Sequence, residues 1–140
     1  MRLDLPADRR DVHTMRMPIR WGDMDAMGHV NNTVYFRYFE SLRIEWLHAI
    51  APPPDPKGEG FVVVNAFCNY LRQLRYPGDL IATLSVGAIG KSSFDTYFRL
   101  ERADEPGVVW ATGGATTVWI DYVAEQAVAL PERIRTVLSR

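Results

Sequence analysis

One predicted helix constrains the fold more than any other part of the chain. From Asn32 to Ile50, apolar residues recur at helical spacing. The main stripe consists of Tyr35, Tyr38, Phe39, Leu42, Trp46 and Ile50, and Phe36, Ile44 and Leu47 add apolar surface beside it. A helix that is apolar over so much of its circumference has to be surrounded by other elements rather than laid on a surface. Either Asn31 or Asn32 can cap its start.

Strand-like segments make up most of the remaining chain. We expect a first strand at 14–21, and Pro18 within it favours an edge position because proline cannot donate to a neighbouring strand. The other expected strands are at about 61–76, 80–89, 93–102 and 108–122. The proline-rich segment 51–60 is predicted to be a connecting loop, and a short helix is predicted at about 131–138. The order predicts a single α+β domain over 1–140, in which an antiparallel sheet curls about the long helix.

The composition is that of a soluble globular protein, with 47% hydrophobic and 24% charged residues. The formal net charge of −1 gives no reason to expect a nucleic acid partner or an anionic membrane surface. We find no apolar run of membrane-spanning length and no secretory signal, so we expect a cytoplasmic location. Cys68 is the single cysteine, which excludes an internal disulfide and cysteine-rich metal sites. It is interpreted as a small buried hydrophobe rather than a nucleophile, and no metal or cofactor is expected.

The segment 20–39 contains the residues that could act as acid, base or nucleophile. The predicted first strand is followed by two carboxylates, Asp23 and Asp25, and then by a short loop with Gly28 and His29. A pair of asparagines then opens the aromatic-rich helix. This order sets acid, base or nucleophilic groups beside the free N–H groups of a helix N-terminus, where developing negative charge is stabilised. Such an arrangement is suited to attack on a carbonyl carbon.

The same segment resembles the active-site stretch of hot-dog-fold acyl-CoA thioesterases related to 4-hydroxybenzoyl-CoA thioesterase. That family has a D-x-D-x-x-G-h-V segment, often continued as H-V-N-N, before its long central helix. The resemblance covers about residues 14–122, with weaker similarity at 76–79 and 89–94. It implies a hot-dog fold, in which a five-stranded antiparallel sheet wraps around the helix. It also implies hydrolysis of an acyl-CoA to a free acid and CoA without a cofactor, in a homodimer or homotetramer whose pockets lie between protomers.

The resemblance places the catalytic carboxylate at Asp25. A carboxylate can attack a thioester to give a mixed anhydride or can activate a water molecule, and the sequence leaves both mechanisms open. Asp23 is expected to hold the loop through hydrogen bonds to nearby N–H groups. His29 is a second catalytic candidate that can orient the loop, donate to the thioester or assist proton transfer. Asn32 is the third.

Substrate-binding roles are expected for two groups of residues. Gly28 would let the backbone turn tightly, and the N–H groups of 31–33, including those of Asn31 and Thr33, would face the thioester oxygen. The asparagine side chains can equally be helix caps. In the predicted turn at 91–93 a cation and two hydroxyls could hold the CoA phosphates. These residues are Lys91, Ser92 and Ser93, with Arg72 and Arg75 as alternatives.

Two other functions remain open. Acyl-carrier-protein thioesterases carry an Asp-x-Asn-x-His pattern, and the corresponding residues here are Asp25, Met27 and His29. Met27 departs from that pattern, so the acyl-CoA branch fits better. The other possibility is a non-catalytic acyl-CoA-binding module, which the carboxylate at Asp25 disfavours.

Overall fold

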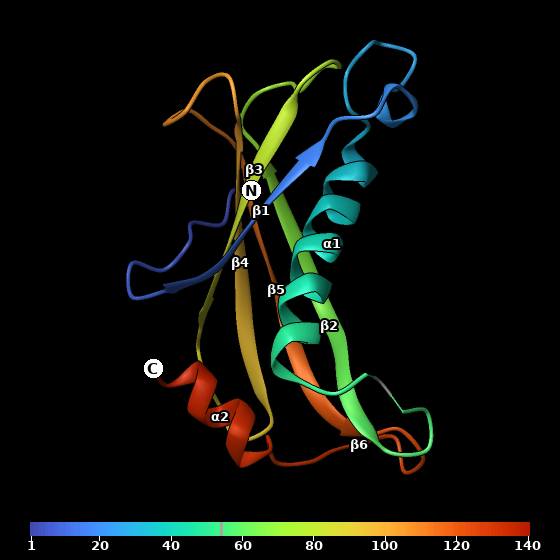
Figure 1. The fold of residues 1–140 in the computed structure, drawn as a ribbon, viewed down its shortest axis with the longest axis vertical. Coiled ribbons are helices and arrows are strands. Elements are labelled where there is room, and N and C mark those ends of the chain that lie inside the picture. Colours follow the sequence, from blue (N-terminus) through green and yellow to red (C-terminus); the bar gives the residue numbers. More distant parts are fainter. Residues whose placement is uncertain (54) are drawn as a thin grey trace.

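The structure is a computed structural model that describes residues 1–53 and 55–140. The described residues form β1 (Arg10–Pro18), a 3-10 helix η1 (Trp21–Asp23), α1 (Asn32–Ile50), β2 (Glu59–Tyr70), β3 (Asp79–Gly87), β4 (Ser93–Arg102), β5 (Val109–Asp121), β6 (Gln126–Ala127) and α2 (Glu132–Leu138). Figure 1 shows α1 lying along one side of the sheet, with α2 at the end where β4 begins.

The strands form one antiparallel sheet in the order β1-β3-β4-β5-β2, and the short β6 pairs with the end of β5. β1 and β2 are therefore the two edges of the main sheet. Pro18 lies in β1 opposite Asp79, so the predicted edge position of the first strand is confirmed. At the other edge, β2 contains an irregularity between Val63 and Asn65.

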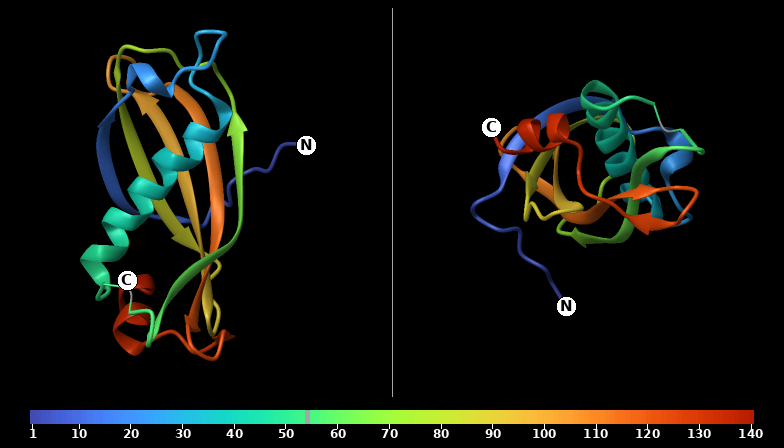
Figure 2. Two further views of the ribbon diagram at one scale, coloured as in Figure 1. Left: turned by 90° about the vertical axis from the view of Figure 1, so that its right-hand side faces the viewer. Right: turned by 90° about the horizontal axis from the view of Figure 1, so that it is seen from below.

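α1 crosses the concave face of the sheet, and the sheet curves around it (Figure 2). The inner side of α1 supplies aromatic residues to the core. The Phe39 ring stacks on Phe98 of β4 with the centroids 4.3 Å apart, and the Trp46 ring meets Phe94 edge to face. These rings hold the helix against the centre of the sheet by burial and by favourable ring geometry. The predicted long central helix within an antiparallel sheet is confirmed.

The outer side of α1 is less buried than the apolar pattern predicts. Phe36 and Ile44 are 37% and 41% exposed in the single chain. Two valines of the edge strand β2, Val63 and Val64, are also exposed, at 43% and 59%. One chain therefore leaves apolar surface uncovered both on the helix and on the free edge of the sheet.

Several boundaries differ from the prediction. β1 begins at Arg10 because residues 10–13 pair with β3, and it ends at Pro18 rather than residue 21. Trp21 lies in η1 and is 73% exposed instead of facing the core. β2 ends at Tyr70 rather than residue 76, because the next two amides both donate to the carbonyl of Trp110. In the predicted loop 51–60, Glu59 and Gly60 already belong to β2, and Pro54 lies outside the described residues.

Candidate active site

The loop between β1 and α1 is built around the carboxylate of Asp23. This side chain is buried, with 7% of the residue exposed. Its Oδ2 accepts hydrogen bonds from the Arg20 N–H at 2.9 Å and from the Tyr38 hydroxyl at 2.7 Å. Its carbonyl accepts from the Asn31 N–H at 3.0 Å. Asp23 therefore ties η1, the loop and α1 together, which is the structural role expected for it.

Asp25 sits at the start of a tight turn that returns the chain to the helix. Its N–H donates to the carbonyl of His29 at 2.8 Å, and its own carbonyl accepts from the Gly28 N–H at 3.0 Å. Gly28 has a φ of +76°, a conformation that glycine adopts without strain, so the expected tight turn at this residue is present. The side-chain Oδ1 accepts from the N–H groups of Met27 at 2.9 Å and His29 at 3.4 Å. The turn thus orients the carboxylate, and among the described residues Oδ2 has no hydrogen-bond donor.

The start of α1 lies directly after this turn. Asn31 is the N-cap, and its side-chain oxygen accepts from the Thr33 N–H at 2.9 Å. The Asn31 and Thr33 amides are thus both engaged within the chain and are not free to bind a thioester oxygen. Among the described residues, the Asn32 N–H has no acceptor. Of the three N–H groups expected to face the thioester oxygen, only that of Asn32 is therefore available, and it lies at the positive end of the helix dipole.

A cleft of about 330 Å³ opens at this end of the molecule. The turn and α1 form one wall, and the end of β2 with the following loop forms the other. The lining residues are Asp25, His29, Val30, Asn32 and Tyr35 on the first wall and Tyr70, Leu71, Arg72 and Gln73 on the second. The three candidate catalytic residues, Asp25, His29 and Asn32, are therefore brought together in one cleft.

Hydrogen bonds join the two walls. The hydroxyl of Tyr70 donates to the carbonyl of Asn32 at 2.7 Å. The Val30 N–H donates to the carbonyl of Leu74 at 2.8 Å, and the Ile19 N–H donates to that of Gly78 at 2.8 Å. The cleft is thus bounded by two loops, 19–31 and 71–78, that are fixed to each other.

His29 is half-buried on the first wall, and its Nε2 lies 3.0 Å from an Nη of Arg75 on the second. A guanidinium can only donate, so a hydrogen bond at this contact requires the Nε2 of His29 to be the acceptor. The contact orients the His29 ring relative to Arg75.

The predicted phosphate-binding turn lies elsewhere in the chain. Lys91 and Ser92 lie in the turn before β4, and Ser93 is the first residue of that strand. This turn lies next to α2, at the opposite end of α1 from the loop 19–31 (Figure 1). Two donors, the Leu130 N–H and the Arg135 guanidinium, bind the carbonyl of Lys91. The structure does not bring this turn to the cleft within one chain, whereas it does bring Arg72 and Arg75 there.

Cys68 lies on β2 and is half-buried. Burial raises the pKa of its thiol to about 12, which suits a packed side chain better than a nucleophile. No group of three or more metal-ligating side chains occurs within 1–53 and 55–140. In the same ranges, no helix is long and apolar enough to cross a membrane.

Sequence reasoning did not single out Tyr70 and Gln73 for the site. Both reach it through the pairing of β2 with β5, which places the end of β2 opposite the start of α1. The local sequence carries no signal for this proximity, which depends on the order of strands. Arg72 and Arg75 were predicted only as alternative phosphate-binding residues, and the place of Arg72 in the cleft and of Arg75 next to His29 likewise follows from the sheet.

Known proteins are similar to this chain in overall sequence and in fold. The family model of the thioesterase-like superfamily matches residues 19–138. A Pseudomonas aeruginosa structure described as “PA2801 protein, a putative Thioesterase” is 32% identical, with a TM-score of 0.85 over 92% of this chain and 99% of its own. A “putative acyl-CoA thioesterase” from Xanthomonas campestris is 31% identical, with a TM-score of 0.77 over 86% and 100%. The uncharacterized protein YsmA of Bacillus subtilis is 27% identical over 88% of this chain and 82% of its own.

The family match spans most of the chain and includes the cleft. The predicted hot-dog fold and the predicted class of enzyme, a thioester hydrolase, are confirmed at the level of the family. The chain belongs to the thioesterase-like superfamily.

Proposed function

We propose that the protein is an acyl-CoA thioesterase that hydrolyses its substrate to a free carboxylic acid and CoA. The observation that carries the proposal is the position of Asp25. Its carboxylate is exposed in the cleft, it is oriented by the N–H groups of Met27 and His29, and its Oδ2 has no donor among the described residues. The name of the Xanthomonas campestris relative supports the choice of an acyl-CoA.

Two routes use the same carboxylate. In the first, an oxygen of Asp25 attacks the thioester carbon, the C–S bond breaks and the CoA thiolate leaves and takes up a proton. Water then hydrolyses the mixed anhydride and restores Asp25. In the second, Asp25 accepts a proton from a water molecule that attacks the carbon directly, after which the C–S bond breaks and the CoA thiolate leaves with that proton. In both routes the Asn32 N–H and the helix dipole would stabilise the negative charge on the thioester oxygen, an effect worth on the order of a few kcal/mol when water is excluded.

The proposal includes a homo-oligomer. The apolar surface left uncovered on α1 and on the free edge of β2 would be buried if a second copy paired along β2. Such pairing would also bring residues of the second copy to the cleft. In such an assembly the turn of Lys91 to Ser93 stays a predicted phosphate site. A cytoplasmic location belongs to the same proposal.

A panel of thioesters assayed for released thiol tests the function. We expect turnover of acyl-CoA substrates that exceeds turnover of the same acyl groups on acyl carrier protein. Faster turnover of the carrier-protein substrates would favour the alternative enzyme. Tight binding of acyl-CoA without any thiol release would favour the non-catalytic binding module.

A further inference from the structure

Two arginines of the loop 71–78 lie at the candidate active site with their charges uncompensated. Arg72 lines the cleft that contains Asp25, and Arg75 reaches His29 at its rim. Both side chains are exposed. Neither has a carboxylate within ion-pair distance in the described parts of the chain. Other exposed arginines, such as Arg16 and Arg37, do have one.

The present contacts of the two guanidinium groups use few of their donors. Arg72 lies over the ring of Trp110, 5.8 Å from its centroid, and its guanidinium has no hydrogen-bond acceptor among the described residues. Arg75 has one side-chain contact of hydrogen-bond length among the described residues, to the Nε2 of His29. A guanidinium offers five N–H donors in a fork that matches a carboxylate or a phosphate. The geometry therefore leaves donors available to an anionic ligand.

The backbone beneath the two arginines is fixed. The N–H groups of Leu71 and Arg72 both donate to the carbonyl of Trp110 at 3.1 Å. The guanidinium of Arg102 donates to the carbonyls of Arg75 at 2.9 Å and Pro77 at 2.7 Å.

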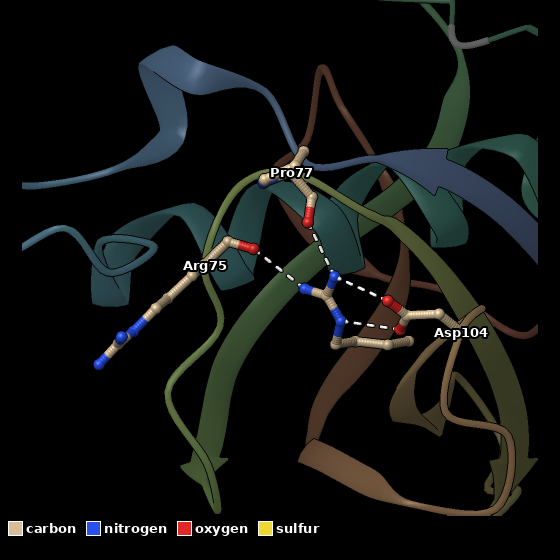
Figure 3. A network of polar contacts seen from close by, with 4 residues as sticks. Arg75, Pro77 and Asp104 are labelled. Atoms are coloured by element: carbon tan, nitrogen blue, oxygen red, sulfur yellow. Dashed lines mark hydrogen bonds and ion pairs between the residues drawn. The ribbon is translucent and has the colours of Figure 1, made fainter.

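Asp104 holds that guanidinium through two hydrogen bonds. Figure 3 shows this network, with the side chain of Arg75 extending away from it. A ligand would thus meet cations on an ordered loop, which reduces the entropy cost of binding.

Negative groups border this region on two sides. Asp25 lies in the same cleft as Arg72, and Glu105 lines a neighbouring cleft together with Arg75. An anion held by both arginines would therefore bind at the wall formed by residues 72–75, away from the carboxylate of Asp25.

We propose that Arg72 and Arg75 form an anion subsite for the thioester substrate, which binds either a carboxylate on the acyl group or a phosphate of CoA. The proposal rests on the proposed thioesterase function and narrows its substrate class. A carboxylate would mean that the enzyme acts on thioesters of dicarboxylic acids. A phosphate would mean that this loop, rather than the turn of Lys91, holds the nucleotide end.

Hydrolysis of four thioesters distinguishes a carboxylate on the acyl group from a phosphate of CoA as the bound anion. The acyl group is butyryl or adipyl, and the thiol is CoA or N-acetylcysteamine, which carries no phosphate. The parent enzyme is compared with Arg72→Gln, Arg75→Gln and the corresponding lysine variants. Arg133→Gln serves as the control, because this exposed arginine lies in α2 far from the cleft. Melting curves confirm that each variant is folded.

We expect kcat/KM to fall about tenfold or more in the glutamine variants for thioesters that carry the recognised anion, in line with loss of a charged hydrogen bond. A loss restricted to adipyl esters identifies the carboxylate, and a loss restricted to CoA esters identifies the phosphate. The lysine variants should recover part of the activity. Unchanged values for all four esters, or an equal loss that includes neutral butyryl-N-acetylcysteamine, would overturn the subsite.

Failure of the proposed function gives a different result, because the parent would then hydrolyse none of the four esters. In that case calorimetric titration with CoA and with adipate decides on the subsite. Binding that Arg72→Gln and Arg75→Gln weaken about tenfold, and that Arg133→Gln leaves unchanged, supports it. Absence of binding to the parent overturns it.

Discussion

The hydroxyl of Tyr38, on the second turn of α1, donates a 2.7 Å hydrogen bond to the buried carboxylate of Asp23. This bond links the central helix to the loop that presents Asp25. Tyr38→Phe should lower the free energy of unfolding by about 1–3 kcal/mol, because the buried Oδ2 of Asp23 loses one of its two donors and keeps only the Arg20 N–H. Urea unfolding measures the change. Tyr76→Phe is the matched control, since that exposed hydroxyl has no hydrogen-bond partner within 1–53 and 55–140, and an equal effect in both variants would contradict the argument.

The same pair gives a prediction at high pH. Burial, followed by the hydrogen bond and charge of Asp23, raises the pKa of Tyr38 well above its ordinary value of 10.0. The unfolded tyrosine therefore loses its proton first, and stability falls as the pH rises above about 10. Other tyrosines with a raised pKa contribute to the same decline. Unfolding curves from pH 8 to 11 should show a shallower decline for Tyr38→Phe than for the parent, and an identical slope would contradict the assignment.

Substitution of Asp25 tests the carboxylate directly. Asn keeps an oxygen that can accept from the Met27 N–H, so Asp25→Asn should preserve the turn and the melting temperature. An amide can neither form the anhydride nor accept a proton from water, so kcat should fall about 10²-fold or more. Asp23→Asn should cost less activity and more stability. Steady-state rates and melting curves compare the two variants, and an Asp25→Asn enzyme as fast as the parent would favour the binding-module alternative.

Cys68 should behave as a packing residue. With a pKa of about 12, its thiol is almost entirely protonated at pH 8. Alkylation by iodoacetamide should therefore be about a thousandfold slower than for an unperturbed cysteine with a pKa of about 8.5. Mass spectrometry follows the reaction in folded and urea-unfolded protein. Cys68→Ala should retain full thioesterase activity, and loss of turnover with an intact fold would show that the thiol takes part in the chemistry.

Gly113 on β5 permits the close approach of two neighbours. A Cβ at this position would lie 2.5 Å from the carbonyl oxygen of Phe67 and 3.0 Å from the ring of Phe39. Gly113→Ala should therefore destabilise the fold by about 1–3 kcal/mol. Gly22→Ala is the control, because a Cβ added there would have no neighbour within 4 Å and the φ of this residue needs no glycine. Thermal unfolding should separate the two variants by several degrees, and equal melting temperatures would contradict the packing argument.

The free edge of β2 tests the proposed assembly. Light scattering of the parent should give at least twice the chain mass of 15.9 kDa. Val64→Asp, on this edge, should shift the protein toward the monomer and lower activity, because a charge there opposes strand pairing. Val123→Asp, in the exposed turn between β5 and β6 rather than on β2, should change neither. A parent that is active as a stable monomer would rule out the assembly.

The elements that were predicted accurately are those with a local signal. α1 has the bounds that its apolar repeat and its capping asparagine indicate, and β4 and α2 also match their expected ranges. The predicted start of β1 was too late, because its first residues, from Arg10 onward, are mostly polar and become strand only by pairing with β3. The predicted end of β2 was too late. The strand ends where the N–H groups of Leu71 and Arg72 both donate to the carbonyl of Trp110, and the alternation of side chains in the sequence does not show this.

The residues of the candidate site also fall into those that a local motif predicts and those that it does not. Asp25, His29 and Asn32 lie within eight residues of one another, so a local motif is enough to group them. Tyr70 and Arg72 join them only because β2 ends beside the start of α1, which depends on the order of strands in the sheet. The predicted role of Lys91 depends on a second copy of the chain, because its turn lies at the far end of α1 within one chain.

The hydrogen bonds from Ile19 to Gly78 and from Val30 to Leu74 bind the loop 19–31, near both of its ends, to the end and the middle of the loop 71–78. Each loop therefore sets the length that the other can have. A residue inserted into or deleted from one of them would pull these amides and carbonyls out of register, whereas a change of side chain at an exposed position such as Arg72 leaves the bonds intact. If Arg72 and Arg75 bind the substrate as proposed, point substitution would change substrate preference without breaking these bonds, whereas transplanting a loop from a relative would require both loops to be exchanged together.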